Sequence, residues 1–270
     1  MILIADSGSS KTDWRLIDGE NISQFETIGL NPFVVSSQKI EETILSLNIE
    51  CSSVKQLFFY GAGCGNLEKS KAVNSVLSSV FKNAITTVET DLLAVAYALL
   101  QGKSGVVGIL GTGSNVAFFD GKEVTPVTTS LGYLLGDEGS GNFIGKQFLK
   151  LLLTDSLDED LKNEMNIDTD GLLSELYSHP FPNRFLASFC KILFPHKSHP
   201  QIAKILADTF NEWIRIYLLP YNIKTINLCG SISYYFSAEL KSCCSTHGIN
   251  IELILEKPIS ALTLYHLENQ

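Results

Sequence analysis

The fold is indicated by a stretch near the start of the chain, which reads Ile2-Leu3-Ile4-Ala5-Asp6-Ser7-Gly8-Ser9-Ser10-Lys11-Thr12-Asp13-Trp14-Arg15-Leu16-Ile17-Asp18-Gly19. The same pattern returns further along as Val106-Val107-Gly108-Ile109-Leu110-Gly111-Thr112-Gly113-Ser114-Asn115-Val116-Ala117-Phe118-Phe119-Asp120-Gly121. Each stretch has an apolar strand, a turn of small residues, a second apolar strand and then Asp-Gly. Because glycine lets the backbone approach a ligand closely, successive N–H groups of such turns can point at phosphate oxygens. Either turn taken alone could be an ordinary hairpin turn. Because two such turns occur at matching places in the two halves of the chain, we expect them to hold one polyphosphate between two lobes.

The segments around these hairpins alternate between strand and helix patterns. Strands are expected at Met1–Ala5, Asp13–Ile17, Gln24–Leu30, Gln56–Tyr60, Ala84–Glu89, Val106–Leu110, Asn115–Phe119, Thr225–Cys229 and Asn250–Leu255. Helices are expected at Gln38–Leu47, Glu68–Phe81, Leu92–Gln101, Lys146–Leu153, Gln201–Leu219, Tyr234–His247 and Ile259–Leu267, with Asp155–Pro200 mostly helical and irregular. This alternation predicts an α/β fold. The segment Gly102–Gly105 is the expected domain boundary.

Composition limits the classes of partner. The 270 residues carry a formal net charge of -9, which argues against nucleic acid and anionic membranes, since both attract basic surfaces. A nucleotide remains compatible, because main-chain N–H groups and a metal ion can hold phosphates without much Lys or Arg. The start of the chain has no basic segment followed by a long apolar run, and the six cysteines form no C-x-x-C pair. We therefore expect a reduced, cytoplasmic protein.

Two aspartates are candidates for chemistry. Asp6 ends an apolar strand, where a carboxylate needs a reason to be buried, and contact with a metal-bound water is one such reason. Asp91 lies between a strand and an apolar helix, where an aspartate often caps the helix N-terminus. The same position is the carboxyl end of a strand, where α/β folds open their clefts, so Asp91 is also a candidate general base.

A third candidate is the loop Gly132–Gly141, which combines four glycines and a serine with Asp137 and Glu138. Asp137 is expected to hold sugar hydroxyls or a metal, with an acidic solvated loop as the alternative. The other motifs considered do not indicate a specific kind of site. The segment Gly61–Gly65 follows a strand but lacks the G-x-G-x-x-G spacing of a dinucleotide site. The five histidines lack zinc-ligand spacing, and neither a P-loop nor a G-x-S-x-G elbow is present.

At this point the residues resemble a known family. Five blocks occur in the order seen in N-acetylglucosamine kinases and the related BadF/BadG/BcrA/BcrD ATPases, which belong to the superfamily of actin, hexokinase and the heat-shock chaperones. The blocks are Asp6–Thr12, Thr90-Asp91, Gly111-Thr112-Gly113-Ser114-Asn115, Gly136-Asp137-Glu138-Gly139-Ser140 and Leu228-Cys229-Gly230-Ser231. The resemblance implies two ribonuclease-H-like lobes with an ATP and sugar cleft between them. The lobes would be residues 1–103, with helix 259–270 packing back on them, and residues 104–258 with a helical insertion.

The resemblance also implies site residues. Asp91 would be the catalytic base, and Asp6 would contact Mg²⁺ through water. The groups contacting ATP would be Gly8, Ser9, Ser10, Lys11, Thr12, Gly111, Thr112, Gly113, Ser114, Gly230 and Ser231. The sugar would be contacted by Asn31, Asp91, Asn115, Gly132, Tyr133 and Asp137. The implied substrates are ATP and a small sugar.

The chain also departs from the family pattern. It is short between Ser140 and Gly230, has Leu131 where the amino-sugar kinases have Trp, and has Ser9-Ser10 where many relatives have Gly-Gly. We expect an ATP-dependent kinase that phosphorylates an amino sugar, with N-acetylglucosamine as the first candidate and N-acetylmuramate or glucosamine as alternatives. An ATPase that activates a partner enzyme and a non-catalytic sugar sensor are the other classes considered. No cysteine lies between Cys64 and Cys190, near the second hairpin, where the activators hold an iron–sulfur cluster. A homodimer is an open alternative for the oligomeric state.

Overall fold

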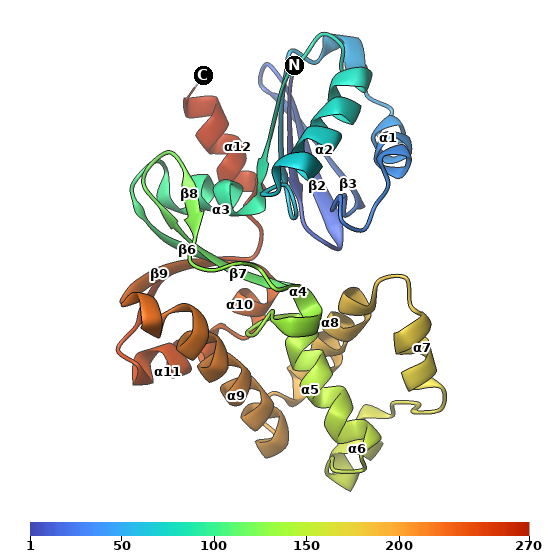
Figure 1. Cartoon of the computed structure of the whole chain (residues 1–270), viewed down its shortest axis with the longest axis vertical. Coiled ribbons are helices and arrows are strands. Elements are labelled where there is room, and N and C mark those ends of the chain that lie inside the picture. The colour runs from blue at the N-terminus through green and yellow to red at the C-terminus, as the bar shows by residue number, and fades with distance from the viewer. Residues whose placement is uncertain (270) are drawn as a thin grey trace. The chain divides into compact units, whose positions relative to one another are not determined.

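The structure is a computed structural model that describes residues 1–269, and the chain in it forms two compact units (Figure 1). The first unit comprises Met1–Ser104, Phe119–Val124 and the residues from Lys257 onward. The second unit comprises Gly105–Phe118 and Thr125–Glu256. The final residue of the helix range expected from the sequence, Gln270, lies outside the described residues.

The first unit contains a five-stranded mixed sheet. Its strands are β1 (Ile2–Ser7), β2 (Lys11–Asp18), β3 (Asn21–Ile28), β4 (Gln56–Gly61) and β5 (Ile85–Thr90). Their order across the sheet is β3-β2-β1-β4-β5. The β1–β2 and β2–β3 pairs are antiparallel, whereas β4 is parallel to both β1 and β5. The carboxyl ends of β1, β4 and β5 therefore meet at one edge of this sheet.

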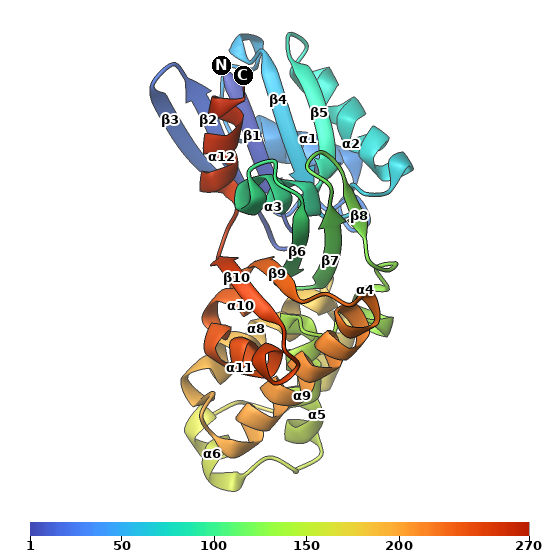
Figure 2. The same cartoon turned by 90° about the vertical axis from the view of Figure 1, so that its left-hand side faces the viewer.

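Helices cover both faces of the first sheet. They are α1 (Ser37–Leu45), α2 (Leu67–Val80), α3 (Asp91–Leu100) and α12 (Ile259–Glu268), with a short 3₁₀ helix at Cys51–Ser53. Figure 2 shows α3 and α12 in front of the sheet and α1 and α2 behind it. The side-chain oxygens of Ser36 and Asn66 cap the first turns of α1 and α2 by accepting main-chain N–H groups. The core on the α1–α2 side includes Trp14 and Phe59, both fully buried.

The second unit repeats this topology. Its strands are β6 (Gly105–Leu110), β7 (Ser114–Phe119), β8 (Val124–Pro126), β9 (Thr225–Cys229) and β10 (Asn250–Leu255). Their order is β10-β9-β6-β7-β8, in which β6 and β9 pair in parallel at the centre as β1 and β4 do in the first sheet. Strand β9 is also parallel to β10, as β4 is to β5. The repeat seen in the two sequence hairpins is therefore a repeat of the whole sheet.

The second unit is richer in helices. They are α4 (Gly132–Leu135), α5 (Gly141–Leu153), α6 (Glu159–Met165), α7 (Leu172–Ser178), α8 (Pro182–Leu193), α9 (Pro200–Tyr217), α10 (Ser231–Tyr235) and α11 (Ser237–Thr246), with 3₁₀ helices at Phe194–His196 and Leu219–Tyr221. A large apolar core around Phe148, Phe210 and Trp213 joins α5, α8 and α9 to the sheet. Among residues 1–269, no helix combines the length and apolar character needed to cross a bilayer.

Local structure corrects several expected boundaries. Helix α5 begins at Gly141 and not at Lys146, because the Ser140 side chain caps it by accepting the Phe143 N–H. The helix expected over Tyr234–His247 is two helices that meet at Phe236, a residue outside the helical φ/ψ range. The short edge strand β8 has no sequence signal of its own, and its place beside β7 defines it. These differences leave the predicted α/β class unchanged.

Candidate functional site

In the first unit, Asp6 lies near the carboxyl end of β1. It is half-buried and stands in register with Asp13 on β2 and Tyr60 on β4. Burial raises the pKa of Asp6 to about 7, and the negative charges of Asp91 and Asp13 contribute to the increase, against a smaller opposite effect of Lys257. Asp6 therefore lies close enough to Asp91 and to Asp13 for the negative charge of each to disfavour its ionisation.

The hairpin that follows Asp6 is held by a buried hydroxyl network. The hydroxyls of Ser7 and Thr12, both fully buried, lie 2.8 Å apart, and Thr12 donates to the main-chain oxygen of Ile28 at 2.9 Å. The turn itself closes through the Gly8 N–H, which donates to the Lys11 oxygen at 3.0 Å. Thr12 thus supports the turn from inside, whereas the segment from Gly8 to Lys11 is partly or fully exposed. Of the predicted phosphate ligands here, the structure turns Gly8, Ser9, Ser10 and Lys11 outward.

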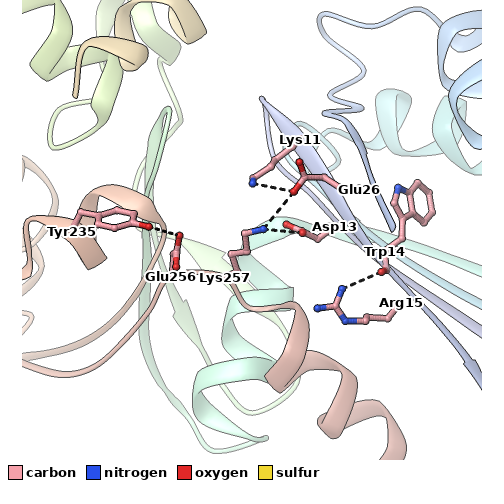
Figure 3. Close-up of polar contacts among 8 residues, drawn as sticks. All are labelled: Lys11, Asp13, Trp14, Arg15, Glu26, Tyr235, Glu256 and Lys257. Carbon is pink, nitrogen blue, oxygen red and sulfur yellow. Dashed lines mark hydrogen bonds and ion pairs between the residues drawn. The ribbon is translucent and has the colours of Figure 1, made fainter. Parts of the chain in front are cut away.

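Two lysines lie beside this hairpin. Lys11 is exposed and pairs with Glu26 of β3 at 3.1 Å. Lys257, which precedes α12, points toward the same strands: its Nζ is 2.9 Å from Asp13 Oδ1 and 3.6 Å from Glu26 Oε2 (Figure 3). Lys257 was not predicted from the sequence, because a single lysine between a strand and a helix carries no motif. Only the return of the chain to the first unit brings its charge to Asp13.

Asp91 is the first residue of α3, directly after β5. Thr90 occupies the N-cap position, so the interpretation of Asp91 as the N-cap residue is off by one. Asp91 Oδ1 accepts hydrogen bonds from the Thr90 hydroxyl at 3.1 Å and from the Leu92 N–H at 3.0 Å. Burial raises the pKa of Asp91, and these two bonds oppose the increase. Within residues 1–269, the hydrogen bonds from Thr90 and Leu92 both end on Oδ1, so Oδ2 remains available to a ligand.

Asn31 lies in the loop after β3, which is tied to the hairpin. The Leu30 N–H donates to Ser7 Oγ at 3.0 Å, and this bond fixes the start of the loop. Asn31 Oδ1 accepts the Phe33 N–H at 3.0 Å, and the main-chain oxygen of Asn31 accepts the N–H groups of Val34 and Val35. The side-chain amide of Asn31 is therefore fixed through its oxygen, and among residues 1–269 its nitrogen has no acceptor and can donate to a ligand.

In the second unit, the start of α5 holds the second hairpin turn. The Gly141 N–H donates to the Gly111 oxygen at 2.8 Å, and the Asn142 N–H donates to the Thr112 oxygen at 3.1 Å. The Asn142 side chain donates to that same Thr112 oxygen at 2.6 Å. The carbonyl groups of Gly111 and Thr112 are thereby drawn toward α5, whereas the Gly111 N–H donates within the turn to the Gly113 oxygen at 3.0 Å. Asn142 is a second residue that was not predicted from the sequence; its position just after the Gly136–Ser140 block was the available signal.

Asp137 lies under the same turn. Its Oδ1 accepts the Ser114 N–H at 3.4 Å, and its Oδ2 accepts the Asn142 side-chain N–H at 2.8 Å. Burial raises the pKa of Asp137, against the effect of these bonds. The residue has φ +61°, a left-handed conformation that is rare for a residue with a side chain. The structure therefore makes Asp137 a support for the Gly113–Ser114 turn, and each of its carboxylate oxygens keeps capacity for a further donor.

The remaining predicted residues of the second unit lie in three places. Gly132 and Tyr133 begin the short helix α4, where the Tyr133 oxygen accepts the Lys146 ammonium at 2.9 Å. Asn115 Oδ1 accepts the N–H of its neighbour Val116 at 3.0 Å. Gly230 has φ +118°, and a Cβ there would lie 2.4 Å from the Leu110 oxygen, so glycine is required. This close approach brings the Gly230–Ser231 turn directly beside the second hairpin.

The structure thus assembles the predicted residues in two groups, one in each unit. In the first unit, contacts or mutual charge effects connect Asp6, the Gly8–Lys11 turn, Asn31 and Asp91. In the second, contacts connect the Gly111–Ser114 turn with Asp137 and Gly230. Carboxylates of raised pKa can exchange protons with a hydroxyl, and glycine turns can bind phosphate oxygens. Among residues 1–269, no group of three or more His, Cys, Asp or Glu side chains is placed to hold a metal by itself.

Three of the solved structures that are similar to this chain bear on its family and fold. A candidate N-acetylglucosamine kinase from Porphyromonas gingivalis is 33% identical, with a TM-score of 0.91 over 100% of this chain and 99% of that one. A candidate N-acetylglucosamine kinase from Chromobacterium violaceum is 14% identical, with a TM-score of 0.66 over 98% of both chains. A ROK family glucokinase from Streptomyces griseus, solved with glucose and AMPPNP, is 12% identical, with a TM-score of 0.56 over 99% of this chain and 98% of that one.

The two likenesses of low identity concern the fold alone, and they confirm the expected α/β architecture with two related sheets. No family model matches the chain. No curated protein matches it by sequence either. The full-length likeness at 33% identity bears on more than the fold.

Proposed function

The chain belongs to the actin-like sugar kinase family, and from this membership we propose that it transfers the γ-phosphate of ATP to a hydroxyl group of an amino sugar. The first candidate acceptor is N-acetylglucosamine, because the relative that is 33% identical over the whole chain is itself a candidate N-acetylglucosamine kinase. N-acetylmuramate and glucosamine are the alternatives, and the 6-hydroxyl is the proposed acceptor group.

The observation that carries this proposal is the environment of Asp91. Its raised pKa makes it a better proton acceptor than an exposed aspartate, and its Oδ2 is free to receive a hydroxyl proton. The fixed bonds to Oδ1 from Thr90 and Leu92 hold the carboxylate in one orientation. A general base in this state suits the deprotonation of an alcohol.

In the proposed reaction, the acceptor oxygen attacks the γ-phosphorus of ATP. The O–P bond to the acceptor forms, the bond from the γ-phosphorus to the β,γ-bridging oxygen breaks, and ADP leaves with that electron pair. Asp91 takes the hydroxyl proton during the attack. Base catalysis of this kind contributes roughly 10²–10⁴-fold to a rate, and positioning of the phosphates supplies much of the remainder.

We propose that the turns of the two hairpins bind phosphate groups of ATP. The proposed phosphate contacts are Gly8, Ser9, Ser10 and Lys11 in the first unit and Gly111, Thr112, Gly113 and Ser114 in the second, with Thr12 as internal support. The Gly111 and Ser114 N–H groups already donate within the protein, to the Gly113 oxygen and to Asp137. The Gly230–Ser231 turn, packed beside Leu110, is proposed to contact the nucleoside. For the sugar, the proposed contacts are Asn31, Asn115, Gly132, Tyr133 and Asp137.

The carboxylates of the first unit fit a magnesium ion. Mg²⁺ is usually held by one or two carboxylates together with substrate phosphates and water, so a cage made of protein side chains alone is not needed. The charges of Asp91 and Asp13 contribute to the raised pKa of Asp6, and this repulsion is what a nearby divalent cation offsets. We propose that Asp6 contacts the ion through water. The ion, when bound, neutralises charge on the phosphates.

The test is the variant Asp91→Ala with a coupled assay of ADP release over hexoses, hexosamines, N-acetylhexosamines and N-acetylmuramate. The wild-type chain should release ADP with an amino sugar, and the variant should lose at least about 10²-fold in kcat while it keeps its folding and its affinity for ATP. Thr90→Ala is the matched control, because it removes one bond to Asp91 Oδ1 and leaves the carboxylate. Near-normal turnover in Asp91→Ala would overturn the assignment of the base.

A further inference from the structure

We propose that the loop Gly61–Gly65 forms one wall of the acceptor subsite, and that Gly63 is a positioning residue that sets the place of the Asn31 side chain. The inference rests on the proposed function, since it assigns part of the sugar site. All of the residues involved belong to the first unit. The glycines of this loop, whose spacing does not fit a dinucleotide site, would then serve to shape the acceptor subsite.

The loop is attached to the first hairpin. It follows β4, and the Ala62 N–H donates to the main-chain oxygen of Ser7 at 2.8 Å. Two further bonds tighten it: the Cys64 N–H donates to the Gly61 oxygen at 3.0 Å and the Asn66 N–H to the Gly63 oxygen at 3.4 Å. The loop therefore keeps a fixed place beside the strand end that carries Asp6.

Gly63 packs directly against Asn31. It has φ +86°, and a Cβ at this position would lie 2.6 Å from Asn31 Oδ1 and 3.0 Å from Cδ2 of Phe33. Asn31 Oδ1 also accepts the Phe33 N–H, so the oxygen is confined from two sides. A methyl group at residue 63 must displace the Asn31 amide, and with it the nitrogen that is free to donate to a sugar oxygen.

The other end of the loop reaches the catalytic aspartate. A Cβ at Gly65 would lie 3.8 Å from the Thr90 hydroxyl, which donates to Asp91 Oδ1. Between the two glycines lies the buried Cys64: burial raises the pKa of its thiol, and the negative charge of Asp91 adds to the increase. The loop thus lies against Asn31 at one end and near Thr90, the neighbour of Asp91, at the other. A sugar bound by both Asn31 and Asp91 would therefore lie along this loop.

The experiment compares Gly63→Ala with Gly102→Ala. Gly102 has a similar φ of +80°, but a Cβ there would have no atom within 4 Å, so its variant has the same backbone strain without the contact to Asn31. We expect Gly63→Ala to raise the KM for the amino sugar about tenfold or more and to leave the KM for ATP within about twofold. Gly102→Ala should leave both values near those of the wild type. Equal changes in the two KM values, or none, would overturn the inference.

A second measurement separates this inference from the proposed function. The side-chain amide signals of Asn31, assigned in ¹⁵N NMR spectra from the spectrum of Asn31→Ser, should move in Gly63→Ala and stay in place in Gly102→Ala. Failure of the wild-type chain to phosphorylate any sugar would sink the proposed function, and the amide signals would still decide whether Gly63 positions Asn31. Unmoved signals in Gly63→Ala would overturn the positioning role whatever the activity.

Discussion

The side-chain amide of Asn142 donates to the main-chain oxygen of Thr112 at 2.6 Å, and through this bond helix α5 holds the glycine turn of the second hairpin. The same amide donates to Asp137, whose other oxygen accepts the Ser114 N–H. One buried asparagine therefore connects the acidic loop to the turn that we propose binds phosphate. The function proposed for the turn depends on this arrangement, because the N–H groups of a mobile turn would not keep the fixed directions needed to bind a phosphate.

Asn142→Ala should weaken ATP binding more than sugar binding. The variant removes hydrogen-bond donors to Thr112 and Asp137 at a fully buried position. The free energy of unfolding should therefore fall by about 1–3 kcal/mol. We expect the KM for ATP to rise severalfold and the KM for sugar to change less. Leu149→Ala, on the same helix, is the matched control, since it destabilises the core by about 2–5 kcal/mol without touching the turn. A similar rise of the KM for ATP in Leu149→Ala would assign the effect to stability alone.

Lys257→Gln should affect the first hairpin although residue 257 lies far along the chain. Asp13 loses its ion pair with Lys257, which at this degree of exposure stabilises folding by about 1 kcal/mol at most. The loss of the positive charge should also raise the pKa of Asp6, because Lys257 lowers it. The pKa of the Asp6 carboxyl, followed by ¹³C NMR in the metal-free protein, should therefore rise in the variant. Lys39→Gln, which breaks the exposed pair with Glu42, is the control and should leave the pKa of Asp6 in place.

Asp6→Asn should stabilise the metal-free protein at alkaline pH. The folded-state pKa of Asp6, about 7, exceeds the ordinary value of 3.8, so the folded state holds a proton that the unfolded state has lost. The wild type consequently loses stability as pH rises from about 4 through 7, by about 4 kcal/mol at most. Thermal unfolding in EDTA at about pH 5 and about pH 8.5, on either side of the folded-state pKa, should show a larger gain for the variant at the higher pH. Asp18→Asn controls for the loss of one charge, and a variant less stable than the wild type at the higher pH would contradict the prediction.

His266→Gln should change stability in the opposite pH direction. His266 stacks on Phe58 with 4.0 Å between ring centroids and hydrogen-bonds Tyr60 at 2.9 Å, and burial lowers its pKa from 6.5 to about 4. Between these two pKa values the unfolded state binds a proton that the folded state does not bind. The histidine therefore lowers the free energy of unfolding as pH falls from about 6.5 to 4, by about 3 kcal/mol at most. Glutamine does not titrate in this range, so the stability of the variant relative to the wild type should increase as the pH is lowered. Tyr60→Phe, which keeps the titrating ring, should retain the acid loss; equal slopes in wild type and His266→Gln would contradict this prediction.

Local sequence was sufficient for much of the fold. The alternation of apolar runs predicted the strands from β1 to β10 apart from β8, because a buried strand needs apolar residues whatever surrounds it. Strand β8 escaped prediction because three residues at a sheet edge carry too little pattern. The break at Phe236 escaped because both flanking segments have helical composition.

The candidate site was only partly readable in the same way. The glycines of the two turns, Asp6 and Asp91 stood out by their residue type next to apolar strands. Asn142 and Lys257 did not, since an asparagine inside a helix and a lysine in a connector are common on any surface. Their roles arise from contacts with residues far away in the chain, at Thr112 and Asp13.

By itself, the sequence determined that this protein has two hairpins of one kind, an α/β architecture and carboxylates at strand ends, because these features depend on neighbours in the chain. Only the tertiary structure decided which polar groups are consumed inside the protein and which are left for a ligand. Thr12 uses its hydroxyl inside the protein to hold the first turn, and each oxygen of Asp137 accepts one bond at the second turn. Within residues 1–269, Asp91 keeps Oδ2 and Asn31 keeps its amide nitrogen for a ligand. A hydrogen bond is satisfied by whichever partner lies within about 3 Å, and that partner is set by packing, which no local pattern encodes.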